Sequence, residues 1–455
     1  MKVLEARKEE RDLVTATHVC ARWREILTSA THLWNKIDFK YPGQLAYHYL
    51  EQSKGALIDV TLGEGSEIFR PAEIFVGSTP WVRRMKSLCI QRETEQIREF
   101  AQAQGLCQET PNLRSLAIEG KSRARSRSDT TGAGGNIYFP DNFLGKQAPS
   151  LQSLTFRSVS PGNIFAFPLP SLTHIDWIAE TTYVVFEELL ELFASSPRLE
   201  TIRMHVSLQT HTQGPSKTVT LNNLHDLDWG DHGGSTSLIP CLIAPKLSKL
   251  EIRVTHKPQH QWTTLSSILS ANPSHIPLLL EPTAVAYVHD HGNRSYHFCY
   301  PEATDPEIAY LIVSQVTENR DTDALIGCWF SADLPISFSR TQKLVVEVIG
   351  GFPPLDDVPI EKFDSLHELQ LIGNVDWLVQ ILEAKHGKPS PCGTLSKIFI
   401  SRIDHSSTLR ELRKVLEKRN ETGHRVKTVQ ISKGHNFTGA EIEGLREAVD
   451  EFIPD

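Results

Sequence analysis

A short phrase of apolar and polar residues recurs along most of the chain. It reads Pro-x-Leu-x-x-Leu-x-apolar, with substitutions, and clear copies begin at Pro111 and Pro149. Its last residues alternate between apolar and polar, which is the pattern of a strand buried on one face. The proline ends the preceding element and fixes the direction in which the chain enters the strand. We therefore expect a strand at each copy. The other copies are 170–177, 197–204, 222–229, 245–252, 364–371, 393–400 and, in degenerate form, 425–431.

These copies return at a spacing typical of stacked repeats. The first leucine of the phrase recurs at Leu151, Leu172, Leu199, Leu224 and Leu247, in steps of 21, 27, 25 and 23 residues. These steps are inside or near the period of leucine-rich repeats. Longer steps occur elsewhere, so the array is irregular. One such strand cannot bury its apolar face alone, whereas stacked neighbours bury it against one another in a solenoid.

Helical patterns lie between several of the strands, and each places its apolar residues on one face. The sets are Phe186, Leu189, Leu190 and Phe193; Val375, Leu378, Val379 and Leu382; Leu409, Leu412, Val415 and Leu416; and Ile442, Leu445, Val449 and Phe452. The last helix is expected to begin at Thr438, which forms a capping box with Glu441. Alternating strands and helices predict an α/β fold, with a parallel sheet on the inner side of a horseshoe or arc.

Two stretches change this picture. Ahead of the first copy, 44–52 is typical of a short helix and 56–62 of a strand. From 281 to 350 the rhythm breaks, and alternation becomes longer at 295–300 and 343–349. We therefore predict an irregular leucine-rich-repeat-like solenoid over 43–455, with a β-rich insertion at about 281–350.

A different pattern occupies residues 17–39. One apolar helix face is formed by Val19, Trp23, Ile26 and Leu27, at spacings of four, seven and eight. A second apolar cluster contains Leu33, Trp34 and Ile37. The two tryptophans are either the core of a small helical unit or a surface that docks a partner, and the spacing favours docking. If Trp23 is buried, Trp23→Ala is expected to cost about 3–5 kcal/mol.

The run Val19-Cys-x-x-Trp-Arg, followed by Leu33-Trp and Ile37-Asp-Phe, resembles the second half of an F-box. It is most similar to the F-box proteins of mushroom-forming fungi, and the join at 51–62 resembles that family's transition into its repeats. The resemblance implies a helical segment over 1–42 that docks on a Skp-type adaptor and, through it, on a cullin. The implied adaptor-binding residues are Val19, Cys20, Trp23, Leu33, Trp34 and Ile37.

The F-box-like segment departs from its family at one point. An F-box normally opens with a Leu-Pro-x-Glu helix, and nothing in 2–12 supplies that motif. We therefore expect an N-terminally truncated module, either because the gene model begins too late or because this copy binds the adaptor weakly or not at all.

Composition restricts the class of protein further. Among 455 residues 40% are hydrophobic and 22% charged, so the chain can bury a core. A net charge of −8 argues against a nucleic-acid binder. The seven cysteines are an odd number without a Cys-x-x-Cys pair, which predicts free thiols in a cytoplasmic or nuclear protein. The sequence also predicts no signal peptide and no membrane span.

Few residues indicate chemistry. No nucleophile elbow, zinc-protease motif or phosphate-binding loop is present, and we expect no catalytic residue and no cofactor. Cys20 is expected to be a packed thiol beside Trp23. An ordinary polar strand and turn explains His289, Asp290, His291, His297 and Cys299 better than a metal site. The basic run 121–129 is interpreted as a solvated insertion, with nuclear import or phosphorylation as alternatives. Asp176, Asp228, Asp231 and His232 are contact residues for a partner or polar strand ends.

Three hypotheses follow. The first is a substrate-recognition subunit of an SCF-type cullin-RING ubiquitin ligase, which binds the adaptor and an unidentified protein target. The second is a leucine-rich-repeat scaffold without ligase function. The third is an enzyme on a parallel α/β sheet, which would require a deep pocket lined by convergent polar groups.

Overall fold

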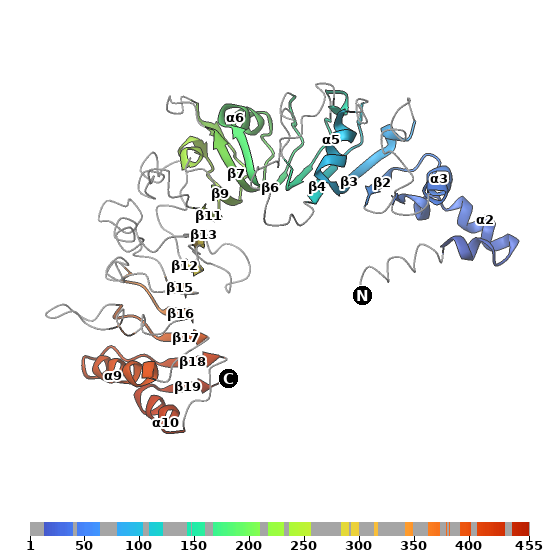
Figure 1. The fold of residues 1–455 in the computed structure, drawn as a ribbon. Coiled ribbons are helices and arrows are strands. Elements are labelled where there is room, and N and C mark those ends of the chain that lie inside the picture. The colour runs from blue at the N-terminus through green and yellow to red at the C-terminus, as the bar shows by residue number, and fades with distance from the viewer. Residues whose placement is uncertain are drawn as a thin grey trace, which may run out of the picture. The chain divides into compact units, whose positions relative to one another are not determined.

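The structure is a computed structural model of an α/β protein built on parallel sheets (Figure 1). It describes residues 13–39, 43–63, 80–102, 109–121, 143–146, 148–159, 167–209, 217–231, 236–255, 284–290, 293–299, 314–316, 342–348, 363–373, 379, 382, 392–401, 407–432 and 439–454. The chain divides into two compact units. Unit 1 comprises Met1–Val184 and Ser195–Arg198, and unit 2 comprises Val185–Ala194 and Leu199–Asp455. The predicted boundary at residue 42 is not one of these divisions and stays a prediction.

In unit 1 the strands pair in chain order, each parallel to the next. They are β1 (Lys36–Asp38), β2 (Ile58–Leu62), β3 (Met85–Glu93), β4 (Ser115–Lys121), β5 (Ser153–Arg157) and β6 (His174–Val185). The helices of unit 1 include α2 (Ala21–Ser29), α3 (Gly43–Gln52) and α5 (Thr94–Gln102), and residues 13–17 are also helical. Short 3-10 turns are η1 (Thr31–Trp34), η2 (Val82–Arg84) and η3 (Phe143–Lys146).

Unit 2 contains two runs of parallel strands. The first run is β7 (Thr201–Gln209), β9 (Asp226–Asp231) and β11 (Lys249–Thr255). The second is β15 (Lys343–Val348), β16 (Glu368–Gly373), β17 (Lys397–Ser401), β18 (Thr428–Ser432) and β19 (Glu451–Pro454). Its helices are α6 (Phe186–Ser195), α9 (Ser407–Glu421) and α10 (Gly439–Ala448), with the turn η4 (Thr236–Cys241). A small separate pair is formed by β8 (Val219–Thr220) and β10 (Leu242–Ile243).

Antiparallel pairing occurs between the two runs. The strands β12 (Ala284–Asp290) and β13 (Asn293–Cys299) form a hairpin, and β13 is also antiparallel to β11. On its other side β12 runs parallel to β15. The short β14 (Ser314–Val316) pairs with β11 and β13. All of this lies within or beside the stretch 281–350, whose identity as an insertion stays a prediction.

The repeated phrase becomes the same local structure at each copy. All nine copies lead into a strand, as the sequence predicts. The first leucine is buried, as for Leu113 and Leu395, because it ends a tight turn beneath the strand. In seven of the nine copies its amide donates to the carbonyl three residues earlier, for example Leu172 to Leu169 at 3.0 Å. The two following apolar positions, such as Leu154 and Phe156, are buried on the same face.

One recurrent hydrogen-bond pattern sets the register between copies. The carbonyl of Gln152 accepts bonds from two successive amides of the next copy, Thr173 at 2.9 Å and His174 at 3.0 Å. The same pair of hydrogen bonds, from two successive amides to one carbonyl oxygen, occurs at Arg114, Glu200, His225, Gln342, His367, Ser396 and Lys427. In six of these eight cases both segments are copies of the phrase, and the accepting carbonyl belongs to the residue that follows the first leucine.

The helix predictions are confirmed in part. The helix α6 buries Phe186, Leu189, Leu190 and Phe193, and α9 buries all four of its predicted apolar residues. The pattern 44–52 is the helix α3, and 56–62 contains β2. Of the set at 375–382 only Val379 and Leu382 are described, both in helical conformation, and Leu382 is buried.

Two element predictions are wrong. The last helix ends at Ala448, and Phe452 belongs to the strand β19, which pairs with β18. Its helical spacing from Val449 was coincidental, because register with β18 governs this end of the chain. The helix over Val19–Leu27 begins only at Ala21, because the backbone of Cys20 is extended. Thr438, the expected cap, lies outside the described residues, and β3 and α5 were not predicted.

A partly buried arginine joins the N-terminal helices to the sheet of unit 1. Arg84, at the end of η2, donates from Nη1 to the Ser53 hydroxyl and the Ala56 carbonyl, both at 3.2 Å, and also to the Lys54 carbonyl. These acceptors form the turn between α3 and β2, where Lys54 has a positive φ of 46°. Burial lowers the pKa of Arg84 from its ordinary value. The guanidinium therefore holds this strained turn against the start of β3.

We expect Arg84→Ala to lower the free energy of unfolding by about 1–3 kcal/mol, because it leaves three acceptors without their donor. Arg83→Ala is the matched control, since the Arg83 side chain is 70% exposed and only 3.6 Å from Glu109 in an exposed ion pair. That control should change stability by less than about 1 kcal/mol. Urea unfolding followed by circular dichroism measures both variants. Equal effects of the two substitutions would contradict the proposed role of Arg84 in holding the turn.

Candidate partner-docking site

Exposed apolar side chains gather in the N-terminal helical part of the chain. Of the seven large exposed hydrophobic residues among those the structure describes, six lie between residues 19 and 57. The most exposed are Val19 (67%), Ile26 (55%) and Trp23 (53%), followed by Leu33 (40%). We call these four residues the apolar patch. The helix α2 has no buried residue, so its apolar face does not serve the core of this chain.

A buried indole supports the patch from beneath. Trp34 is 0% exposed, and its Nε1 donates to the carbonyl of Leu27 near the end of α2, at 2.7 Å. The same ring makes edge-on contacts with His48 and Tyr49 of α3, at centroid distances of 5.4 and 5.0 Å. Ile37, three residues later on β1, is also buried, with 1% of its surface exposed. Trp34 therefore fixes α2 against α3.

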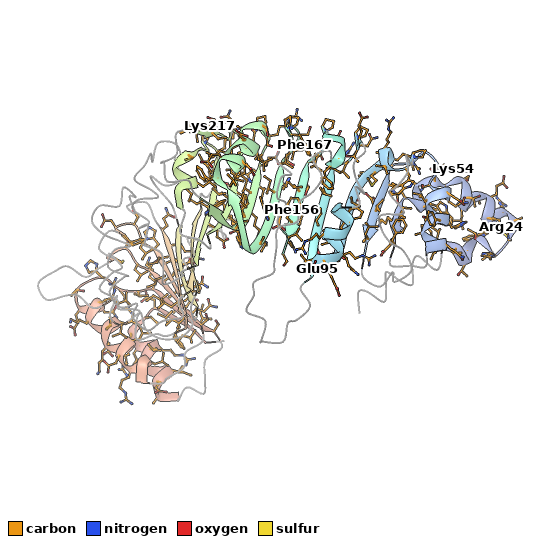
Figure 2. The ribbon with its side chains drawn as sticks, turned by 45° about the horizontal axis from the view of Figure 1, so that its top comes forward. Arg24, Lys54, Glu95, Phe156, Phe167 and Lys217 are labelled. Carbon is orange, nitrogen blue, oxygen red and sulfur yellow. The ribbon has the colours of Figure 1, made fainter. Side chains whose placement is uncertain are left out.

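The chain ahead of α2 is also held in place. The amides of His18 and Val19 donate back to Thr15 and Ala16, which closes a turn before the helix. Arg24 donates from Nε to the carbonyl of Thr17 at 3.0 Å, so a residue on α2 fixes the turn that carries Val19. Lys54, after α3, reaches the carbonyl of Thr28 at 3.5 Å. Figure 2 labels Arg24 and Lys54 at this end of unit 1.

The six predicted adaptor-binding residues separate into two groups. Val19, Cys20, Trp23 and Leu33 are exposed and available to a partner. Trp34 and Ile37 are buried, which corrects their assignment as direct contacts: in this structure they support the surface. The expectation of a packed Cys20 thiol is also wrong, because Cys20 precedes the helix and is exposed. Ile26 is exposed in the same patch, although the resemblance did not name it.

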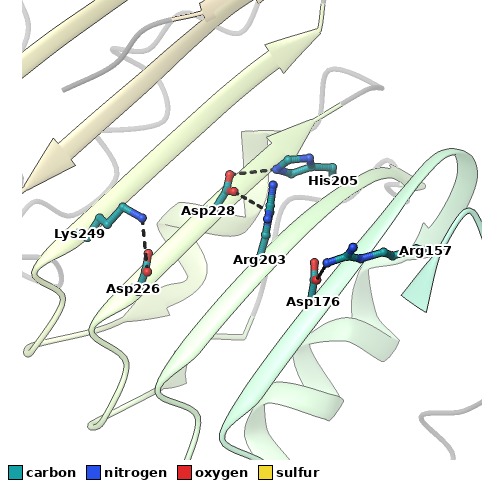
Figure 3. Close-up of polar contacts among 7 residues, drawn as sticks. All are labelled: Arg157, Asp176, Arg203, His205, Asp226, Asp228 and Lys249. Carbon is teal, nitrogen blue, oxygen red and sulfur yellow. Dashed lines mark hydrogen bonds and ion pairs between the residues drawn. The ribbon is translucent and has the colours of Figure 1, made fainter. Parts of the chain in front are cut away.

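The polar face of the sheet in unit 2 carries a charged cluster (Figure 3). Asp228 on β9 lies 3.1 Å from Nε of Arg203 and 2.9 Å from Nε2 of His205, both on β7. His205 and Asp228 are 8% and 7% exposed. Their partners offset the cost of burying these groups. One strand further, Lys249 on β11 lies 3.4 Å from Asp226.

A glycine makes this cluster possible. Gly230 is the register partner of His205, and a Cβ added to it would lie 2.7 Å from the imidazole. The missing side chain lets the ring lie across β9 and reach Asp228. Sequence reasoning missed Arg203, His205 and Gly230. Aligning the copies at 197–204 and 222–229 places Arg203 opposite Asp228, and that signal could have found the pair.

Two of the three aspartates that were open candidates, Asp176 and Asp228, are engaged in ion pairs. Asp176 on β6 accepts a hydrogen bond from Arg157 on β5 at 2.6 Å, and this bond raises the pKa of Arg157 from its ordinary value. Asp228 is buried, so it is a support for β7 and not an open contact. The side chain of Asp231 is not described, and His232 lies outside the described residues.

The remaining candidates carry little chemistry. His297 and Cys299 lie on β13 opposite Glu251 and Lys249, but their side chains are not described, and neither are those of His289 and Asp290. His291 and the basic run beyond Lys121 lie outside the described residues. No group of three or more His, Cys, Asp or Glu suited to a metal occurs among the residues that the structure describes. Burial raises the pKa of the Cys241 thiol to about 11, which keeps it protonated.

Comparison with known proteins adds no identity. No protein-family model matches the chain, and no curated protein matches it significantly. Within the described part of the chain, no helix has the length and apolar character needed to cross a bilayer.

Substitution of the two tryptophans by alanine should have different effects on the stability of unit 1. We expect Trp34→Ala to destabilise unit 1 by about 3–5 kcal/mol, because it empties a buried site and removes the bond to Leu27. Trp23→Ala should change stability by about 0.5 kcal/mol or less, as for exposed positions elsewhere. Urea midpoints measure both. A large loss for Trp23→Ala would mean that the patch is part of the core.

Gly230→Ala should lower the free energy of unfolding by about 1–3 kcal/mol, because the new methyl group collides with His205. In a His205→Ala background the same change should cost much less, with a coupling of at least about 0.5 kcal/mol. Gly439→Ala, where a Cβ meets nothing within 4 Å, is the control in the same unit. Additive effects of Gly230→Ala and His205→Ala would refute the close approach.

Proposed function

We propose that this chain is the substrate-recognition subunit of an SCF-type cullin-RING ubiquitin ligase. The observation that carries the proposal is the exposed apolar patch of Val19, Trp23, Ile26 and Leu33, held rigidly by the buried Trp34. It lies in the segment whose sequence resembles an F-box. An exposed tryptophan in a segment that also exposes three aliphatic side chains is typical of a protein-binding hot spot.

In this proposal the repeated strands form an irregular leucine-rich-repeat solenoid that presents a target protein. The support is the parallel pairing of successive copies, one buried face per strand and a polar opposite face. The chain would contribute no bond chemistry. By holding the target beside a ubiquitin-charged enzyme on other subunits, it would raise the effective concentration of a target lysine.

In this proposal the residues of the F-box-like segment have two different roles. Val19, Trp23, Ile26 and Leu33 would enter the adaptor interface, and the exposed Cys20 would lie at its margin. Trp34 and Ile37 would keep α2, η1 and β1 in place from within. A leucine-rich-repeat scaffold without ligase function is the alternative.

Binding of a purified Skp-type adaptor tests the proposal. We expect Trp23→Ala to weaken binding by about thirtyfold or more, as at a hot spot worth about 2 kcal/mol. Leu57→Ala is the matched control, because Leu57 is exposed at 37% but lies outside the patch. Isothermal titration calorimetry reports both, with circular dichroism to show that the variants fold.

A second arm separates the two candidate functions. The chain is also measured with a Leu-Pro-x-Glu helix added before Asp12. Binding in either form that depends on Trp23 supports the receptor. No binding in both forms rules out the ligase role and favours the scaffold.

A further inference from the structure

The polar face of the last four strands carries an ordered row of side chains. Gln370 on β16, Phe399 on β17, Gln430 on β18 and Ile453 on β19 are successive register partners. They lie on the face opposite the buried row that contains Leu371, Ile400 and Ile431. The row therefore alternates amide, aromatic, amide and aliphatic. We call it the Gln-Phe-Gln-Ile row.

The row is open to solvent. Ile453 is 37% exposed, and Phe399, Gln370 and Gln430 are partly exposed. Among the described residues, no side-chain hydrogen bond engages either glutamine amide, whereas neighbouring polar side chains on this face are paired, such as Lys343 with Glu368 at 2.5 Å and Thr428 with Glu451 at 3.2 Å. Two amides whose donors have no side-chain hydrogen bond among the described residues thus flank a partly exposed aromatic ring.

The spacing of the row selects one backbone conformation for a ligand. Neighbouring strands are about 4.7–4.9 Å apart, so like groups, two strands apart, repeat at about 9.4–9.8 Å. A polyproline II segment repeats every three residues, at about 9.3 Å. A β-strand repeats its side chains at about 6.6–6.8 Å, which matches neither one strand spacing nor two. An α-helix offers about 5.4 Å per turn, and two turns give about 10.8 Å.

The chemistry agrees with the spacing. A polyproline II backbone makes no internal hydrogen bonds, so its carbonyls are free to accept from the amides of Gln370 and Gln430. Proline rings at every third position would meet Phe399 and Ile453, because aromatic-lined surfaces are the usual partners of such segments. We propose that the Gln-Phe-Gln-Ile row binds a proline-containing Pro-x-x-Pro segment that runs across the strands in the polyproline II conformation.

The positive charge of Lys397, next to the row, favours an acidic residue in the bound segment. Lys397 lies two residues before Phe399 on β17 and is exposed, and no carboxylate pairs with it among the described residues. Its register partner Glu368 is already engaged by Lys343. An acidic residue at one of the two variable positions of the segment would therefore be favoured.

Fluorescence anisotropy of the full chain with a labelled proline decamer tests the proposal, and a glycine-serine decamer is the control peptide. We expect the proline decamer alone to bind, and Phe399→Ala to weaken it about tenfold. Gln370→Glu and Gln430→Glu keep the side-chain shape but remove the donors, and each should weaken binding about two- to tenfold. Ser432→Ala, further along the same face of β18, should leave binding unchanged.

The charge preference has its own comparison. A Pro-x-x-Pro peptide with glutamate at one variable position should bind about 1.5- to fivefold tighter than its lysine counterpart, and Lys397→Ala should remove the difference. No binding of the proline decamer at 1 mM, or equal binding by Phe399→Ala, overturns the proposal. So does dimerisation of the chain through Phe399 in sedimentation, because a second copy then occupies the row. These measurements need no adaptor, so their failure is distinct from failure of the docking experiment.

Discussion

The double hydrogen bond between successive copies is the constraint on which the rest of the structure depends. At eight carbonyls one oxygen accepts from two successive amides of the next strand segment, and in six of these cases both segments are copies of the phrase. Where it occurs, this contact starts the parallel pair in one register, so apolar positions meet on one face and polar positions on the other. The alignment of Arg203 with Asp228 and of Gln370 with Phe399 follows from it.

The same alignment gives the two faces of the sheet different tasks. One face contains the core, where Leu, Ile, Phe and Trp side chains are almost fully buried. The other contains polar groups that either pair with one another, as Arg157 with Asp176, or stay open, as in the Gln-Phe-Gln-Ile row. The N-terminal helices differ from both: Arg84 joins the turn after α3 to the sheet, Trp34 holds α2 against α3, and α2 leaves its apolar face exposed.

Much of this architecture was predictable from the sequence, because the phrase encodes turn, strand and buried face within eight residues. The patch was harder. The spacing of Val19, Trp23 and Ile26 specifies an apolar helix face but not whether its own chain or a partner covers it, and Trp34 and Ile37 in the same segment are core. The strand β19 was mistaken for helix, since short segments obey both periods. Contacts such as His205 with Asp228 depend on register and on the absence of a side chain at Gly230.

The pair of hydrogen bonds to one carbonyl also explains why successive strands pair regularly although the segments between them differ in length. The strands β4 and β5 pair in full register although the chain between Lys121 and Phe143 is long, since the features that pin them lie in the turn and strand alone. Doubling the length of a connecting segment costs only about 0.6 kcal/mol of closure entropy. Insertions between two paired strands are therefore expected to cost little stability, which also makes these connections suitable places to graft a foreign epitope.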